Sequence, residues 1–190
     1  FAFDSPFAVG CSAIAVGNTR GEDGPTFLAR NFDFEGGDVF DRDKVVLAVR
    51  PRGRFAFVSV GWSGMAGVVT GINEHGLAIA INAGASADFR RVGTPTTLLV
   101  RRALEQARNI DQALAILTAG KPFISDILIL ADRAGSVAVL ELTPDRFGVR
   151  RGPLLVATNH FESPTLANDP VNIARTRSNT TLPRHARLEA

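Results

Sequence analysis

The sequence is poor in several residue types, and each shortage excludes a class of protein. Its 190 residues contain a single cysteine, Cys11, so no disulfide can form within the chain. Apolar runs such as residues 127–131 are far shorter than the roughly 20 residues that a membrane-spanning helix needs. Because 45% of the residues are apolar and 21% are charged, disorder and a collagen-like chain are excluded as well. We therefore expect one globular domain with a single core.

Lysine is also scarce, which bears on the kind of partner. Only two of the 21 basic residues are lysines, Lys44 and Lys121. The chain also has 19 acidic residues, so its net charge is +2. The arginines are scattered singly or in pairs, whereas a nucleic-acid surface usually shows a basic stripe with aromatic residues between the charges. We expect no nucleic-acid partner.

Motifs for metals and cofactors are missing. The histidines at 75, 160 and 185 lie far apart and lack the spacing of zinc ligands. Residues 33–43 are acidic, but they lack the glycine and terminal glutamate positions of an EF-hand, so we interpret them as a solvated loop. No phosphate-binding glycine loop and no GxSxG elbow occurs. The sequence predicts neither a metal nor a cofactor.

Turn residues divide the chain into short apolar segments. The pattern first predicts strands at 11–17, 26–32, 44–50, 54–60, 66–72 and 76–82. Two helices are predicted next, at 95–108 with Thr94 as N-cap, and at 111–119. Four more strands are predicted at 126–131, 136–142, 147–150 and 154–158. Residues 161–183 are polar and rich in turn formers, and a last helix is expected to start near Arg184. Blocks of strands with grouped helices predict an α+β fold, in which two mainly antiparallel sheets face each other beneath helices.

Cys11 is the best candidate for chemistry, although a lone cysteine in an apolar strand is more often part of the core. It follows Gly10, and three further segments stand in order after it: RNFD at 30–33, NEHGLAIA at 73–80 and TNHF at 158–161. Together these segments resemble the cysteine N-terminal nucleophile hydrolases, in particular the autoproteolytic acyl-CoA:6-aminopenicillanic acid acyltransferase branch. Choloylglycine hydrolases, penicillin V acylases and acid ceramidase are related to it.

The resemblance implies a four-layer αββα fold and a self-processing nucleophile. Cys11 would attack the Gly10 carbonyl and release a free α-amino group on hydrolysis, and this amine would then serve as the base for the thiol. Arg30 would favour the thiolate, and Asp33 would orient the amine. Because residues 30 and 33 point to opposite faces of a strand, both can reach Cys11 only if the chain bends between residues 31 and 34. The alternative for the pair is an inert ion pair at the surface.

The resemblance also implies donors for the oxyanion of the tetrahedral intermediate. These are Asn159, and Asn82 through its side chain or its backbone amide. Asn82 could instead be a turn residue that ends a strand. A late arginine of the family is assigned to Arg184, with Arg175 and Arg177 as rivals and a surface arginine as the alternative.

The same resemblance sets the expected domain limits. Residues 1–10 are expected to be the remnant of a propeptide and residues 11–190 a single domain. Truncation at the C-terminus is left open, since family members usually continue further. The expected partner is a small-molecule amide or acyl thioester. The acyl acceptor, homo-oligomer formation and location (cytoplasmic, or secreted or periplasmic after removal of a signal peptide) also stay open. The rival hypothesis is an inactive domain that serves as a binding module.

Overall fold

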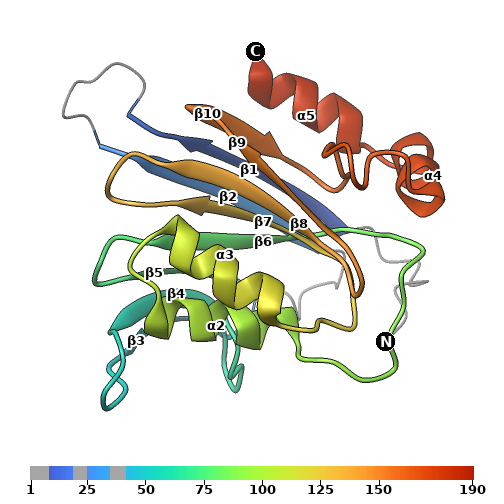
Figure 1. Ribbon diagram of the computed structural model, residues 1–190. Helices are drawn as coiled ribbons and strands as arrows, with labels where there is room; N and C mark the ends of the chain where they lie inside the picture. Colours follow the sequence, from blue (N-terminus) through green and yellow to red (C-terminus); the bar gives the residue numbers. More distant parts are fainter. Residues whose placement is uncertain (1–8, 19–24, 35–41) are drawn as a thin grey trace.

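A computed structural model describes residues 9–18, 25–34 and 42–190 of the chain, which form two antiparallel sheets (Figure 1). The small sheet has three strands in the order β10-β1-β2, with β1 at Val9–Val16, β2 at Phe27–Phe34 and β10 at Leu154–Ala157. The expected first hairpin is confirmed, because β1 and β2 pair directly.

The large sheet has seven strands that neighbour one another in chain order. They are β3 (Lys44–Val49), β4 (Phe57–Trp62), β5 (Thr70–Asn73), β6 (Ala78–Ala83), β7 (Asp126–Ala131), β8 (Val137–Leu142) and β9 (Phe147–Arg151). The hairpins predicted for β3–β4 and β5–β6 are both present. Each joins strands across turn residues such as Gly53 and Gly76, whose positive φ angles suit glycine.

Two apolar cores separate the layers. Helices α2 (Thr96–Gln106) and α3 (Ile110–Ala119) cover the outer face of the large sheet and enclose the first core (Figure 1). The second core lies between the two sheets. In β7, Leu128 and Leu130 face the helices while Ile127 and Ile129 face the small sheet. This strand is buried on both faces, which explains its unbroken apolar sequence.

The fourth layer consists of α4 (Pro170–Ser178) and α5 (Thr181–Glu189), where α5 packs on β1 and β10. The α+β, four-layer arrangement is therefore confirmed, but α4 was missed. Its start carries a recognisable signal, since Asp169 accepts hydrogen bonds from the backbone amides of Val171 and Asn172, with Pro170 as the first helical residue.

Two other helix boundaries differ from the predicted ones. Helix α5 begins at Thr181 rather than near Arg184, because Pro183 is tolerated in the first helical turn, where its missing N–H is not needed. Helix α2 has Pro95, not Thr94, at its N-cap position, and no side chain caps it.

Some expectations fall outside the described residues, namely most of the propeptide (1–8) and most of the acidic loop (35–41). Within the described part of the chain, no helix combines the length and apolar character that crossing a membrane requires.

Candidate functional site

Cys11 lies on β1 with its side chain toward the large sheet, and it is fully buried. Its partner across the β1–β2 ladder is Phe32, and Ala13 pairs with Arg30. Paired residues of an antiparallel ladder point to the same face, so Arg30 shares the face of Cys11. Nη2 of Arg30 donates to the carbonyl oxygen of Ile81 at 2.6 Å, which carries the guanidinium across the gap between the sheets.

Three guanidinium groups lie near enough to Cys11 for their charges to act on it. The charges of Arg30, Arg175 and Arg184 all interact with this residue. Burial lowers the pKa of each guanidinium from its ordinary value, and a negative charge on Cys11 acts in the opposite direction. The thiol is therefore buried in a positively charged environment rather than in a purely apolar one.

The peptide groups on both sides of Cys11 are held by Asn159 and Arg184. The backbone N–H of Cys11 donates to Oδ1 of Asn159 at 2.8 Å. Nη2 of Arg184 donates to the same oxygen at 2.8 Å, while its Nη1 donates to the Cys11 carbonyl and, at 3.0 Å, to Oγ of Ser12. We call these contacts the Cys11–Asn159–Arg184 bridge.

The rival arginines lie differently. Arg175 is half-buried and acts on Cys11 through its charge. Arg177 is exposed and makes no hydrogen bond or ion pair with any residue that the structure describes. Arg184 is thus the late arginine that contacts Cys11 directly.

Asn159 is completely buried, and the orientation of its amide follows from its partners. Its oxygen receives two donors, and its Nδ2 donates to the carbonyl of Ala83 at 2.9 Å. Its backbone N–H donates to Oγ1 of Thr181 at 2.9 Å, and that hydroxyl is 2.8 Å from Oγ1 of Thr158. Sequence reasoning missed both threonines as supports. Thr158 directly precedes Asn159, but Thr181 had no local signal.

Asn82 is used differently from the expectation. It lies within β6, so it is not the turn residue that was considered as the alternative. Its Nδ2 donates to the carbonyls of Ala157 at 3.0 Å and Thr158 at 3.2 Å, and its Oδ1 accepts from Arg30 at 3.4 Å. Because both N–H groups of its side chain are engaged, Asn82 ties β6 to β10. Its backbone amide is then the part of Asn82 for which an oxyanion-donor role stays a prediction.

The expected bend in β2 is wrong. Pairing with β1 continues in one register from Phe27 opposite Val16 to Phe34 opposite Val9. Asp33 therefore points to the face opposite Arg30, and it is exposed. A Cβ atom placed on Gly10 would lie 3.4 Å from Oδ2 of Asp33, so the carboxylate lies beside Gly10. Asp33 can still orient the Cys11 amine from a straight strand, because that amine is a backbone nitrogen rather than a side chain on one face of the sheet.

An apolar pocket of about 260 Å³ begins beside Arg30 and Phe32 and is also lined by Val60, Trp62 and Val69. The rings of Phe32 and Trp62 lie 5.7 Å apart. The pocket shares Val60 and Thr70 with a larger groove of about 840 Å³ between the sheets. Phe32, which is paired with Cys11, lines this cavity, whereas Cys11 itself does not, and the cavity can accept an apolar group.

Asp126, at the start of β7, allows a test of the electrostatics near the site. Burial raises the pKa of its carboxyl from 3.8 to about 6, although the charge of Arg175 opposes this shift. Its Oδ2 has no hydrogen-bond partner among the described residues. Between pH 4 and 6 the folded protein therefore binds more protons than the unfolded chain, and the free energy of unfolding decreases as the pH rises through this window.

We expect the Asp126→Asn substitution to remove this dependence. The contribution is on the order of 3 kcal/mol, because one pKa unit corresponds to about 1.4 kcal/mol. Urea unfolding of both proteins from pH 4 to 7 measures it, and taking their difference cancels the other titrating groups. A difference that does not change with pH would contradict the assignment.

The fold is similar to that of solved N-terminal nucleophile hydrolases. An N-acylethanolamine-hydrolyzing acid amidase ortholog from Caenorhabditis elegans superposes with a TM-score of 0.64 at 17% identity, covering 92% of this chain and 80% of that one. A mutant conjugated bile acid hydrolase from Clostridium perfringens gives 0.56 at 16% identity, covering 75% and 52%. At these identities the likeness shows the fold.

Sequence comparison places the chain in a family. An uncharacterized protein of Archaeoglobus fulgidus is 26% identical over 147 residues, which are 75% of this chain and 24% of that protein. The chain thus spans about a quarter of that relative's length. The family model described as acyl-coenzyme A:6-aminopenicillanic acid acyl-transferase matches residues 19–190, a range that begins after Cys11. The resemblance seen in the short motifs is confirmed, and the chain belongs to the acyl-coenzyme A:6-aminopenicillanic acid acyl-transferase family.

Proposed function

We propose that this chain is a self-processing enzyme that opens a linear C–N amide, or transfers its acyl group, through a thioester on Cys11. The Cys11–Asn159–Arg184 bridge is the observation that carries the proposal. It holds the one backbone nitrogen that must first leave Gly10 and then act as a base.

In the processing step, Sγ of Cys11 attacks the carbonyl carbon of Gly10. The bond from that carbon to the Cys11 nitrogen breaks, the nitrogen takes up the thiol proton, and a thioester forms. Water then hydrolyses the thioester, so that residues 1–10 leave with a free carboxylate. The contact between the Cys11 nitrogen and Oδ1 of Asn159 keeps that nitrogen in place before and after the cut.

In the processed enzyme, the neutral α-amine accepts the proton of the Cys11 thiol, and the three guanidinium groups stabilise the thiolate. The thiolate adds to the substrate carbonyl, and the resulting ammonium group protonates the departing amine. Asn159 is a fitting oxyanion donor, because Nδ2 has two hydrogens and only Ala83 accepts one among the described residues. Water or a second amine then resolves the thioester.

The pocket beside Phe32 and Trp62 suggests which half of the substrate binds there. Its lining is largely apolar, so it suits the hydrocarbon part of an acyl group next to Cys11. The larger adjoining groove can then accept the amine portion.

The runner-up is a non-catalytic domain that keeps the fold and binds a ligand. The complete burial of the Cys11 side chain favours it, since a nucleophile must meet its substrate. In the enzyme hypothesis, the Cys11 thiol becomes accessible to substrate only after the bond between Gly10 and Cys11 is cut.

Intact-mass measurement of the purified protein separates these functions. We expect loss of residues 1–10 and a new amino terminus at Cys11. The Cys11→Ala variant should remain uncut, because it lacks the attacking sulfur, and Cys11→Ser should be cut slowly. Processed protein should release amines from a panel of acyl amides, and added amines should capture the acyl group if it is a transferase. An uncut wild-type chain with an unreactive thiol would instead support the binding module.

A further inference from the structure

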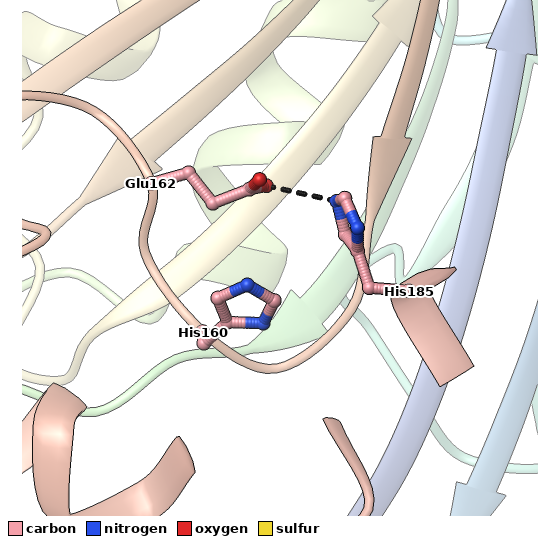
Figure 2. A group of neighbouring side chains, drawn as sticks. All are labelled: His160, Glu162 and His185. Carbon is pink, nitrogen blue, oxygen red and sulfur yellow. Dashed lines mark ion pairs between the residues drawn. The ribbon is translucent and has the colours of Figure 1, made fainter. Parts of the chain in front are cut away.

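The structure gathers two histidines and a glutamate immediately behind the Cys11–Asn159–Arg184 bridge. His160 and Glu162 belong to the segment after β10, and His185 belongs to α5 (Figure 2). One ligand atom from each of these side chains lies within 4.8 Å of the others. We propose that His160, Glu162 and His185 bind a divalent transition-metal ion of the zinc class, which ties α5 to the segment that carries Asn159.

The donor types and distances fit such an ion. Two imidazoles and one carboxylate form a common protein ligand set for Zn²⁺. Nε2 of His185 is 3.2 Å from Oε2 of Glu162. Two ligands of a tetrahedral zinc ion, with bonds of about 2.0–2.1 Å, lie about 3.4 Å apart. For His160 to bind the same ion at such a bond length, its side chain must shift toward the other two ligands by a distance on the order of 1 Å.

Both imidazoles are oriented by partners on their other nitrogen. Nδ1 of His160 is 2.9 Å from Oγ1 of Thr181, and Nδ1 of His185 is 3.4 Å from a carboxylate oxygen of Glu189. Metal-binding histidines usually have such an outer partner, which fixes the ring and directs Nε2 toward the ion. His160 and His185 are 7% and 8% exposed, so these rings are held by the fold rather than by solvent.

The charges around the cluster also permit a cation. Arg150 lies 2.5 Å from Oε2 of Glu162, but it also faces the fully buried carboxylate of Glu141 at 3.5 Å, which balances its charge. Oε2 of Glu162 is the oxygen that lies beside Nε2 of His185, so it is the atom that would bind the ion, and its contact with Arg150 would have to lengthen when the ion binds.

Binding of Co²⁺ and Zn²⁺ tests this proposal in the Cys11→Ala background, which removes the competing thiol and any processing. We expect one ion per chain by titration calorimetry and the visible absorption of four-coordinate Co²⁺. His185→Asn and Glu162→Gln should each weaken metal binding by about 10- to 100-fold or more, because removal of an outer-shell partner alone already costs that much and these residues are direct ligands. Zn²⁺ should raise the unfolding temperature of the parent protein, and should raise it less in His185→Asn and Glu162→Gln.

The matched control is His75→Asn, which removes a histidine remote from the cluster and should leave metal binding unchanged. Circular dichroism and metal-free unfolding verify that each variant is folded. Absence of saturable binding, or equal binding in the parent, His185→Asn and Glu162→Gln proteins, would overturn the proposal. The cluster would then be the histidine–glutamate ion pair drawn in Figure 2.

Discussion

Substitution of Asn159 by alanine should reduce amide cleavage by the processed enzyme by about 10²–10³-fold. That is the usual cost of losing a single oxyanion donor. The same change removes the acceptor shared by the Cys11 nitrogen and Arg184, so cutting of the precursor should slow as well. Single-turnover amine release and the rate of appearance of the new amino terminus measure the two effects separately.

A conservative variant tells the two roles of Asn159 apart. Aspartate keeps an oxygen acceptor for Cys11 and Arg184 but cannot donate, so Asn159→Asp should retain part of the precursor cleavage while losing amide turnover. Asn168, which is exposed, provides a matched control in Asn168→Ala, with no expected change. Full turnover by Asn159→Asp would exclude a donor role for this side chain.

The second large effect is expected at Arg184. Replacement by methionine removes the contacts to the Cys11 carbonyl, to Ser12 and to Asn159. A charge-assisted hydrogen bond contributes about 1.5–3 kcal/mol, so we expect a decrease on the order of 100-fold in precursor cleavage and in kcat/KM. Arg184→Lys should not restore activity, because an ammonium group cannot reproduce the fixed geometry of the two-nitrogen fork.

The neighbouring helix offers the control for Arg184. Arg177→Met removes an exposed arginine of α4 and should leave both rates unchanged. Equal losses in the Arg177 and Arg184 variants would show that net charge, rather than the contacts of Arg184, is responsible. Urea unfolding of each variant verifies that a lower rate does not reflect a loss of folded protein.

Much of the fold could be predicted because local pattern decides it. Turn residues between alternating apolar segments predicted the strands, and the positions of β7 at Asp126–Ala131 agreed with those expected. Helix α4 was missed because its polar, turn-rich sequence hid the helix, although Asp169 and Pro170 carried the signal for its start. Its position depends on capping rather than on an apolar stripe.

The site could be predicted only in part. The short motifs pointed to Cys11, Arg30 and Asn159, which the structure brings together. The same reasoning did not foresee that the Asn82 side chain would tie β6 to β10, and it predicted a bend between Arg30 and Asp33 that β2 does not have. Neither error could be avoided from strand periodicity, which fixes the face of a residue within its own strand but not what the opposing sheet presents to it.

The amino-acid order by itself determined the strand and helix periods, the hairpin turns and the presence of one cysteine after a glycine. Only the tertiary structure decided that Asn159 would hold the Cys11 nitrogen, that Thr181 would support Asn159, and that His160 and His185 would meet. These contacts join residues far apart in the chain. They depend on how the two sheets stack and where α5 packs, and such arrangements arise from burial of the whole apolar core rather than from any local pattern.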